Sequence, residues 1–517
     1  MHRLGIVDLG SNTARLVAFA FEKGRWLRLI DQLREPIRLG EGLGRDGTLT
    51  EEAQRRAETS LALFARYAAN TGLHDVEVLG TSALRDAANR EQFLDRIRPL
   101  GLSVTVLSGE EEARLGVLAA ANGFSMGDAW IMDLGGGSAQ LSRMEKRGFE
   151  EGQAYPLGAV RLTELYLQSD PPKNKEVRDL EQAIAKELAP ISQRLRENDL
   201  PLIAMGGSIR NLARAVQKRN NYPLPDRLHG YFLERSELED LTTELLDLSI
   251  KKRSRIPGIK SDRADIIVAA ALVYRWLVRH GDLDGIWISG YGLREGEFYR
   301  HFLPAPHLID DLRAFSVQNL LQHYAQSKEN IEQTRRLAGR LFWSLRPLQG
   351  WDHEEFDLLD SAAVLQDVGL AVNYYRHDRH GEYLVASARL SGFTHREQAL
   401  MSLLVRYHRR GKPSLGKYRS ICHSSDKQLL EALVACLRIA DHLDRPKSGY
   451  VRDIRVDIGR DSVMIVPIVA SEPDLELWQL EQHEPVFRSA FDRGLRIGAA
   501  EYAPLGPEPL PETVTQM

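Results

Sequence analysis

Residues 6–17, IVDLGSNTARLV, and residues 131–142, IMDLGGGSAQLS, align with each other without a gap. The alignment places Asp8 on Asp133 and Arg15 on Gln140. Each copy is an apolar run, an Asp-Leu-Gly corner with small polar residues, and a second apolar run. This pattern predicts two strands joined by a tight hairpin whose tip offers backbone N–H groups and a carboxylate. Two copies predict two similar lobes that face each other across a cleft and hold phosphate between their tips.

The composition indicates a folded protein of several domains. With 517 residues, 43% apolar and 27% charged, the chain is too long for one core and ordinary in its balance. A formal net charge of −4 excludes a uniformly basic nucleic-acid binder but allows a local basic channel for a polyanion. No apolar run reaches the roughly 18 residues of a membrane span, and Asp8 interrupts the first apolar stretch, so no signal peptide is expected. We therefore expect no nucleic-acid or membrane partner.

The two cysteines, Cys422 and Cys436, allow no disulfide framework and no Cys-x-x-Cys or zinc pattern. A reducing, cytoplasmic location is the simplest one for such a chain.

Up to about residue 300, short apolar strands alternate with amphipathic helices, which predicts α/β lobes. A helix is expected over residues 49–70. The expected strands lie at residues 4–10, 14–21, 76–82 and 103–109 in the first lobe and at 129–136, 139–144, 201–207 and 285–292 in the second.

A Pro-rich junction over Leu303–Asp311 marks a boundary. Helices follow for more than a hundred residues, then a strand pair at 450–458 and 461–469, a final helix over 476–495, and a loose tail of about a dozen residues. The expected helices lie at residues 316–326, 331–345, 357–369, 396–408 and 428–444. The predicted domains are 1–123 (first lobe), 124–303 (second lobe), 304–446 (helical) and 447–517 (a small α+β subdomain and the tail).

Glycines at the hairpin tip let the backbone approach a phosphate closely, so that successive N–H groups converge on its oxygens. A purely structural hairpin is the alternative, but the duplication and two later glycine turns favour anion binding. The later turns include Gly207 and Ser208, where a helix N-terminus attracts anions. The residues expected to bind phosphate are Ser11, Asn12, Gly135, Gly136, Gly137, Ser138, Gly207 and Ser208.

Three charged side chains are candidates for chemistry. Asp133 ends an apolar strand beside the glycine turn and suits magnesium, although an Asp that only shapes the corner is the alternative. Glu112 lies in the first turn of a helix, where the macrodipole favours the ionised form that a base for water needs. Its neighbour Glu111 is explained by a capping box with Ser108, and a solvated carboxylate is the alternative for Glu112. Arg85 can clamp a phosphate with paired donors, or be an ordinary surface arginine.

Eight segments in this order resemble the exopolyphosphatase and guanosine pentaphosphate phosphohydrolase family of the actin-like ATPase superfamily. They cover the first 300 residues, which makes the likeness far more specific than a single motif. The segments are DLGSNTARL, GTSALRDAANR, SGEEEARLG, DLGGGSAQL, PLGAVRLTE, MGGSIRNLA, SDRADIIVAA and ISGYGLREG.

The resemblance implies two duplicated ribonuclease-H-like lobes, an all-α HD-like domain and hydrolysis of a terminal phosphoanhydride. The substrate would be linear polyphosphate or guanosine pentaphosphate. The family's catalytic glutamate falls on Glu112, its phosphate-binding arginine on Arg85, and its metal-linked aspartate on Asp133. A homodimer is implied by analogy with long family members.

One departure from the family pattern is Gln140, which stands where a carboxylate implicated in the metal site is usual. Glutamine can ligate through its amide oxygen or hold a metal-bound water, but it adds no negative charge. We therefore keep Gln140 with Asp133 as expected metal-site residues. A polyphosphate-binding regulator that has lost turnover remains an alternative.

The helical region departs from an HD-type metal site at two positions. Asn330 stands where the first histidine is expected, and Gln366-Asp367 replaces His-Asp, whereas Asp441 is kept. Two replaced ligands argue against a second metallohydrolase.

A basic run at residues 406–420 suggests a track for a long polyanion, with a solvated basic face as the alternative. The residues assigned to this track are Arg409, Arg410 and Lys412. His377 and His380 could join it, although histidines fixed by local hydrogen bonds are the more common case.

The sequence thus predicts a cytoplasmic, magnesium-dependent exopolyphosphatase. A guanosine pentaphosphate hydrolase, a binding protein without turnover and a kinase or ATPase of the same superfamily are the rivals.

Overall fold

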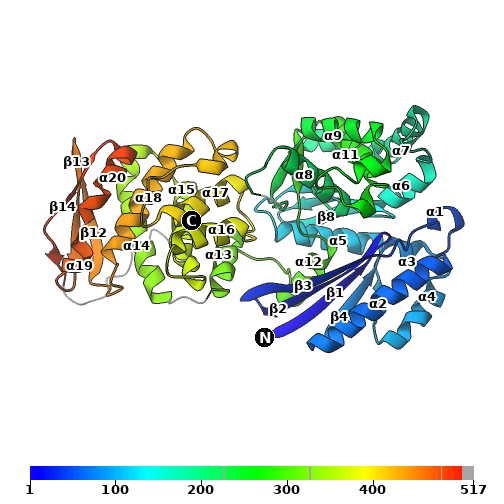
Figure 1. The fold of residues 1–517 in the computed structure, drawn as a ribbon, viewed down its shortest axis with the longest axis horizontal. Coiled ribbons are helices and arrows are strands. Elements are labelled where there is room, and N and C mark those ends of the chain that lie inside the picture. Colours follow the sequence, from blue (N-terminus) through cyan, green and yellow to red (C-terminus); the bar gives the residue numbers. More distant parts are fainter. Residues whose placement is uncertain (225–226, 325–327, 479, 504–517) are drawn as a thin grey trace. The chain divides into compact units, whose positions relative to one another are not determined.

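The computed structural model describes residues 1–224, 227–324, 328–478 and 480–503 (Figure 1). The chain forms two compact units. Unit 1 comprises residues 1–315 with 391–394, and unit 2 comprises residues 316–390 with the described part of 395–517. The division falls inside α13 (Leu312–Gln322), a few residues after the predicted Pro-rich junction. The tail expected at the C-terminus lies outside the described residues.

The first sheet of unit 1 has five strands in the order β3-β2-β1-β4-β5. The first three are antiparallel neighbours, whereas β4 and β5 run parallel to β1. Their bounds are β1 (His2–Leu9), β2 (Thr13–Glu22), β3 (Trp26–Pro36), β4 (Asp75–Gly80) and β5 (Val104–Val106).

The second sheet repeats this arrangement, with the order β8-β7-β6-β9-β11 and β10 added at the edge. Strands β6, β7 and β8 are antiparallel, and β9 and β11 run parallel to β6. The bounds are β6 (Ala129–Leu134), β7 (Ala139–Glu145), β8 (Gly148–Tyr155), β9 (Leu202–Met205), β10 (Tyr231–Glu234) and β11 (Gly285–Ile288). The internal repeat of the sequence is therefore a repeat of the whole sheet.

Helices cover both sheets of unit 1. In the first lobe they are α1 (Leu43–Asp46), α2 (Glu51–Thr71), α3 (Ser82–Asp86), α4 (Arg90–Ile97) and α5 (Gly109–Ala121). In the second they are α6 (Ala159–Tyr166), α7 (Asn174–Asn198), α8 (Gly207–Arg219), α9 (Arg235–Asp247), α10 (Ile250–Arg253), α11 (Ile267–His280) and α12 (Leu293–Phe302). All but two of the residues of α11 are buried, because the helix lies in the core beneath the second sheet.

Two helices are exchanged between the lobes of unit 1. Helix α5 follows the first lobe in sequence, but its Val117 and Ala120 pack against Ile131 of the second sheet. Helix α12 follows the second lobe, but its Phe298 stacks on Phe19 of the first sheet at 4.1 Å between ring centroids. Both helices therefore lie between the two sheets and begin beside the glycine hairpins.

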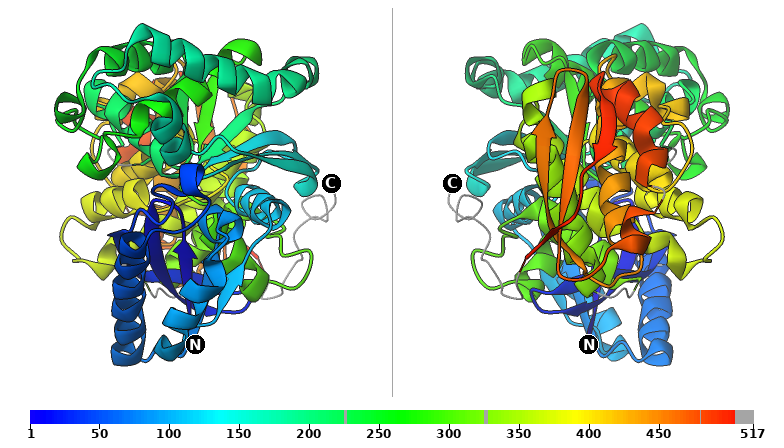
Figure 2. Two further views of the ribbon diagram at one scale, coloured as in Figure 1. Left: turned by 90° about the vertical axis from the view of Figure 1, so that its right-hand side faces the viewer. Right: turned by 90° about the vertical axis from the view of Figure 1, so that its left-hand side faces the viewer.

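Unit 2 is helical, with one small sheet at its C-terminal end. Its helices are the rest of α13, α14 (Lys328–Gln349), α15 (His353–Leu365), α16 (His377–Ser387), α17 (His395–Tyr407), α18 (Asp426–Leu443), α19 (Asp474–Leu477) and α20 (Glu484–Phe491). The sheet has the order β12-β13-β14, with β15 also paired to β13, and Figure 2 shows α20 beside it. The strands are β12 (Val451–Ile458), β13 (Ser462–Val469), β14 (Gly494–Ile497) and β15 (Glu501–Tyr502). The predicted strand pair at 450–458 and 461–469 is confirmed.

The predicted single helix over residues 476–495 is wrong. The segment contains the end of α19, a short 3₁₀ helix over Leu480–His483, α20 and the start of β14. Pro485 lies in the first turn of α20, a position where its missing N–H costs nothing, so a new helix begins there instead of the old one continuing.

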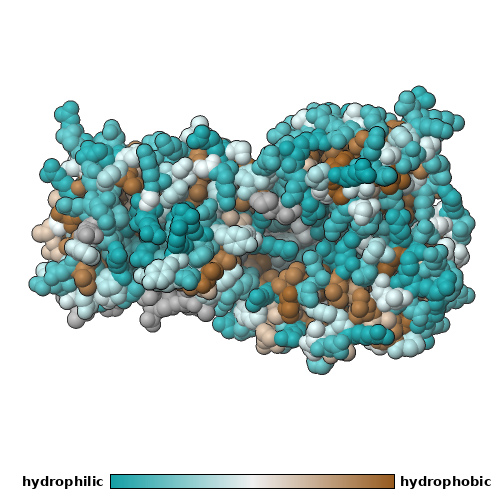
Figure 3. Space-filling view, in the orientation of Figure 1, coloured by the Kyte–Doolittle hydropathy of each residue, from teal (hydrophilic) through white to brown (hydrophobic). Residues whose placement is uncertain are grey.

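The exposed surface in the view of Figure 3 is mostly hydrophilic, with hydrophobic side chains in small groups. Across the described ranges, none of the helices combines the length and the apolar character that a bilayer span requires.

Candidate active site

A cleft in unit 1 collects residues from both hairpins and from both exchanged helices. Its space of about 200 Å³ is lined from β1, β2, β6, β7, α5, α8 and α12. The residues predicted from sequence that line it are Ser11, Asn12, Glu112, Asp133, Gly135, Gly136, Ser138, Gln140 and Gly207. The structure thus brings together nine predicted residues from four separate segments of the sequence, at residues 11–12, 112, 133–140 and 207.

The two hairpins have the same turn geometry. Gly10 N–H donates to the Thr13 carbonyl at 3.1 Å, and Gly135 N–H donates to the Ser138 carbonyl at 2.9 Å. Asp8 pairs across its strands with Arg15, as Asp133 pairs with Gln140. The duplication inferred from sequence therefore extends to the hydrogen bond that closes each turn.

The hairpin tips touch each other, which explains why one copy is made of glycine. A Cβ placed on Gly136 would lie 3.0 Å from the Ser11 Cβ, and one on Gly137 would lie 2.3 Å from the Ser82 Oγ. Ser11 and Ser82 are themselves hydrogen-bonded at 3.0 Å between their hydroxyls. Ser11 of the first tip and Ser82 of α3 thus occupy the space that the second tip leaves free.

Glu112 lies in the first turn of α5 and is 8% exposed. One carboxylate oxygen accepts from the Arg85 guanidinium, and the other accepts from the Gln140 amide nitrogen at 2.9 Å. The predicted capping box of Ser108 and Glu111 is confirmed, which leaves Glu112 free of the cap. Burial, in spite of Arg85, raises the pKa of Glu112 to about 7. Burial therefore outweighs the macrodipole, and the pKa lies where a general base works near neutral pH.

Arg85 and Gln140 both face Glu112. Arg85 also donates to the Leu107 carbonyl at 2.9 Å, so its guanidinium is held beside the base. Gln140 donates a second hydrogen bond to Ser138 Oγ at 2.9 Å. The Gln140 amide nitrogen, which can only donate, is thus directed at Glu112. A contact of Arg85 with phosphate and a metal bond of Gln140 both stay predictions.

The residues around Asp133 fit a divalent cation. The Asp133 carboxylate makes no hydrogen bond or ion pair with another side chain in the described part of the chain. Burial and the neighbouring Asp8 raise its pKa to about 6, and burial also raises the pKa of Asp8. The Asp133 carboxylate is therefore suited to Mg²⁺, which binds one or two carboxylates together with substrate phosphates.

Arginines dominate the rest of the cleft, and sequence reasoning missed them as site residues. Among the residues that line the cleft, seven are cationic against three acidic. The cations are Arg15, Arg34, Arg210, Arg214, Lys260, Arg263 and Arg294. Four of them, Arg15, Arg210, Arg263 and Arg294, stand in segments that carry the family likeness, so those segments were the available signal.

These arginines are fixed in place by the glycine turns and by one aspartate. Arg210 donates to the Gly206 carbonyl at 2.8 Å and to the Gly290 carbonyl at 3.1 Å, and Arg294 pairs with Asp8 at 3.0 Å. Burial and mutual repulsion lower the pKa of Arg15 to about 9 and that of Arg263 to about 10. Such crowding of like charges costs stability, and a bound polyanion would relieve it.

Ser208 lies one layer behind the cleft instead of lining it. The side chain is buried, and its hydroxyl accepts from Arg263 at 3.4 Å. Gly207, at the start of α8, does line the cleft, and a Cβ there would lie 2.2 Å from the Arg263 guanidinium. Gly207 and Ser208, which the sequence predicts to bind phosphate, therefore also help to position Arg263.

The residues of the predicted basic track lie in unit 2, in the loop after α17. Arg410 and Lys412 are exposed and Arg409 is half-buried. Binding of a polyanion by these three residues stays a prediction. His408, in the same run, is buried and does not belong to a basic face. His377 is also buried and is bonded locally to the Tyr374 carbonyl, as the alternative for that histidine supposed.

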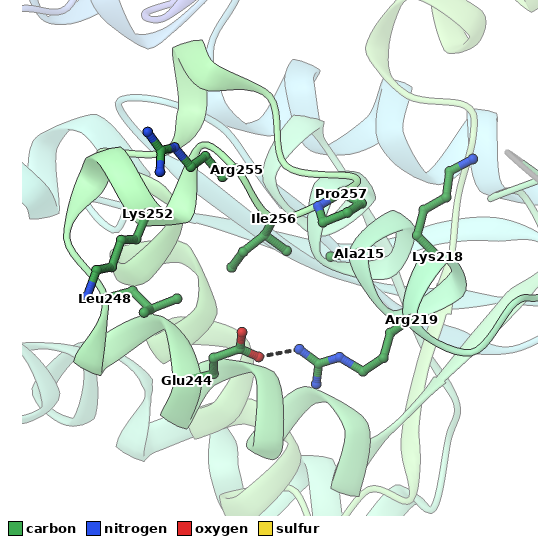
Figure 4. A pocket seen from close by; sticks show the side chains of 9 residues that line it. All are labelled: Ala215, Lys218, Arg219, Glu244, Leu248, Lys252, Arg255, Ile256 and Pro257. Carbon is green, nitrogen blue, oxygen red and sulfur yellow. Dashed lines mark hydrogen bonds and ion pairs between the residues drawn. The ribbon is translucent and has the colours of Figure 1, made fainter.

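A second hollow of about 500 Å³ lies near the C-terminal end of α8, between α8, α9 and α10 (Figure 4). Arg219 reaches across it to an ion pair with Glu244, and Ile256 and Leu248 form apolar parts of its wall. Among the described residues that line it, Arg219 and Glu244 neutralise each other, whereas the cleft gathers charged groups from both lobes. The cleft is therefore the candidate active site.

Comparison with known proteins agrees with this geometry. Residues 18–304 match the Ppx/GppA phosphatase family, and residues 312–470 match domain III of Ppx/GppA phosphatases. Exopolyphosphatase 1 of Mycobacterium tuberculosis is 32% identical over 303 residues, which are 58% of this chain and 88% of that protein. Exopolyphosphatase 1 of Mycobacterium leprae is 31% identical over 303 residues, 58% of this chain and 89% of that protein.

Among solved structures, an exopolyphosphatase from Cytophaga hutchinsonii is similar, with 25% identity and a TM-score of 0.55. The match covers 58% of this chain and 98% of that one. The chain therefore belongs to the Ppx/GppA phosphatase family, and its fold is the mixed α/β, actin-like fold of that family followed by a helical region that matches domain III. Membership of this phosphatase family suggests dependence on a divalent metal.

Proposed function

We propose that this protein is an exopolyphosphatase, which releases orthophosphate from the ends of linear polyphosphate by magnesium-assisted hydrolysis. The observation that carries the proposal is Glu112, a buried carboxylate with a pKa of about 7 that lines a cleft with seven cations. The names of the mycobacterial relatives and of the Cytophaga structure support the same activity.

In the proposed reaction, Glu112 accepts a proton from water as the water oxygen bonds to the terminal phosphorus. The bridging P–O bond on the opposite side breaks, and the shortened chain leaves as the anion. Arg85 and Gln140 hold the two oxygens of Glu112, which fixes the direction of its remaining lone pairs.

The phosphoryl group would be held by the N–H groups of the Gly135–Ser138 turn and the Ser11–Asn12 tip. Asp133 would hold Mg²⁺, with Asp8 nearby, and when bound the ion would neutralise charge on the terminal phosphate oxygens. Positioning and charge neutralisation supply most of the rate in such phosphoryl transfers.

Polyphosphate is favoured over guanosine pentaphosphate by the lining of the cleft. Among the described residues that form it, none is aromatic, whereas nucleobases are commonly held by stacking on aromatic rings. The excess of arginine and lysine suits a ligand that is charged along its whole length. Guanosine pentaphosphate hydrolysis remains the second candidate, because it belongs to the same family.

Further features belong to the same proposal. We expect a homodimer in the cytoplasm, and an HD-like helical region in unit 2 that is not a second hydrolase. Gln366 and Asp367 stand together where His-Asp would be required. The side chain of Asn330 lies outside the described part of the chain.

The test is orthophosphate release from long-chain polyphosphate and from guanosine pentaphosphate, each with and without Mg²⁺. We expect magnesium-dependent release, faster from the polymer. Gln140→Glu, which restores the usual carboxylate, should lower the Mg²⁺ concentration needed for half-maximal release. Tight polymer binding without release by the wild type, with release gained in Gln140→Glu, would instead identify a binding protein that has lost turnover.

A further inference from the structure

Asp367, His377 and His408 converge in unit 2, in the part of the chain to which the proposed hydrolysis assigns no chemistry. The two histidine Nε2 atoms are 3.3 Å apart. The Asp367 Oδ1 is 3.6 Å from the His377 Nε2 and 3.7 Å from the His408 Nε2. The three residues come from three segments: the turn after α15, the first residue of α16 and the residue after α17.

The backbone fixes which ring nitrogens carry protons. His377 Nδ1 lies 2.9 Å from the Tyr374 carbonyl, and His408 Nδ1 lies 2.7 Å from the Val405 carbonyl. A carbonyl can only accept, so in a neutral ring the proton is on Nδ1 and Nε2 is a bare lone pair. Two lone pairs and a carboxylate oxygen therefore face one another, and they repel unless a positive charge lies between them.

A proton is a poor source of that charge. The side chain of His408 is 0% exposed and that of His377 is 5% exposed, so an imidazolium here would be largely removed from water. A metal ion bound directly to the three atoms would supply the charge without a protonated ring.

We propose that Asp367, His377 and His408 bind a divalent transition metal ion of the Zn²⁺ class. A tetrahedral ion with bonds of about 2.0–2.1 Å separates its ligand atoms by roughly 3.3–3.4 Å. The three separations of 3.3, 3.6 and 3.7 Å lie close to that value. Imidazole nitrogen selects Zn²⁺-like ions over Mg²⁺, which prefers an all-oxygen shell. The backbone carbonyls on both Nδ1 atoms are the usual outer support of metal-binding histidines.

The fourth position is available to water. The ion would join the turn after α15, the start of α16 and the end of α17. The expected role is therefore to stabilise unit 2, and histidine and aspartate replace the cysteine ligands that the chain lacks.

The test uses the full-length chain, stripped with a chelator and titrated with Co²⁺ and Zn²⁺. We expect one Co²⁺ per chain with the visible absorption of tetrahedral coordination, displaced by Zn²⁺ and not by excess Mg²⁺. Zn²⁺ should also raise the melting temperature of the stripped protein. His408→Gln and Asp367→Asn should each weaken Zn²⁺ binding at least about 10–100-fold.

The controls separate this site from the cleft and from surface histidines. His380→Gln, on the same helix as His377 but outside the cluster, should bind Zn²⁺ as the wild type does. Asp133→Asn should keep the Co²⁺ absorption, so that failure of the proposed hydrolysis would not affect this result. Absence of tetrahedral Co²⁺ absorption in the wild type would overturn the proposal, and so would equal Zn²⁺ affinity of the wild type and a folded His408→Gln.

Discussion

The two glycine hairpins share one backbone and differ in charge. In the first hairpin, Asp8 is paired with Arg294 and has Arg15 across the strands, so its charge is largely compensated. In the second, Asp133 has Gln140 across the strands and no ion pair in the described part of the chain. One copy is thus suited to hold an anion and the other to hold a cation, and together they suit a phosphate with its metal.

The helices that follow the hairpins differ in the same way. Helix α5 brings Glu112 to the cleft, and helix α12, the other exchanged helix, brings Arg294. The two lobes share one arrangement of strands and helices. Different residues at a few positions place the base on one side of the cleft and the positive charge on the other. Each of the following predictions tests this division of roles.

The largest effect is expected from Glu112→Gln, which keeps the shape of the side chain but removes the base. Turnover should fall by about two to four orders of magnitude, the usual contribution of a general base. The matched control is Glu110→Gln in the same helical turn, whose carboxylate is exposed and pairs with Arg114. Initial rates of orthophosphate release measure both, and a near-normal rate for Glu112→Gln would remove it from the mechanism.

Asp133→Asn and Asp8→Asn should separate the two hairpins. Asp133→Asn is expected to lower apparent Mg²⁺ affinity or activity by at least about 100-fold, because it removes the proposed ligand. Asp8→Asn leaves Arg294 buried without its partner, so it should act chiefly on stability, at a cost of about 3–5 kcal/mol.

Magnesium titrations of phosphate release, together with denaturant unfolding, measure these two variants. Equal shifts in Mg²⁺ dependence for both would contradict the assignment of the cation to the second hairpin alone.

Much of this arrangement could be predicted from sequence, for reasons that lie in local chemistry. The hairpins, the Ser108–Glu111 cap and the glycine turn before α8 are each specified by a few adjacent residues. Strands β3 and β8 were missed, because they are largely exposed, carry several charged residues and owe their form to pairing with β2 and β7.

The charge distribution of the cleft could not be predicted in the same way. Arg15, Arg210 and Arg294 are far apart in sequence, and they meet only because β2, α8 and α12 converge on the cleft. The helical spacing of α5 likewise predicts the position of Glu112 in the helix. It does not predict that the side chain is buried, and burial decides its pKa.

Gly137→Ala tests whether the second tip needs glycine. The new methyl group would lie 2.3 Å from the Ser82 Oγ and 2.7 Å from the Ser11 Oγ, so the tips must separate. We expect a loss of about 1–3 kcal/mol of stability with a matching loss of turnover. Gly127→Ala, where a Cβ meets nothing within 4 Å, is the control. Equal melting temperatures for the two variants would show that the tips are not in contact.

The smallest effect is expected from reversing the charges of Arg409, Arg410 and Lys412 together. If these residues guide a long polyanion, binding of long-chain polyphosphate should weaken severalfold, and binding of short chains that fit within the cleft should change little. Competition binding with polyphosphates of two lengths measures the difference. An equal effect on both lengths would discard the track and leave the hairpins as the whole binding site.

The most direct measurement combines binding and cleavage in one variant. Long-chain polyphosphate is titrated onto Glu112→Gln, and orthophosphate release is followed in the same samples with Mg²⁺. Affinity within a few-fold of the wild type, with release reduced at least about 100-fold, is the predicted result. Release at the wild-type rate, or a loss of binding as large as the loss of release, would contradict the assignment of Glu112 as the base between two phosphate-holding hairpins.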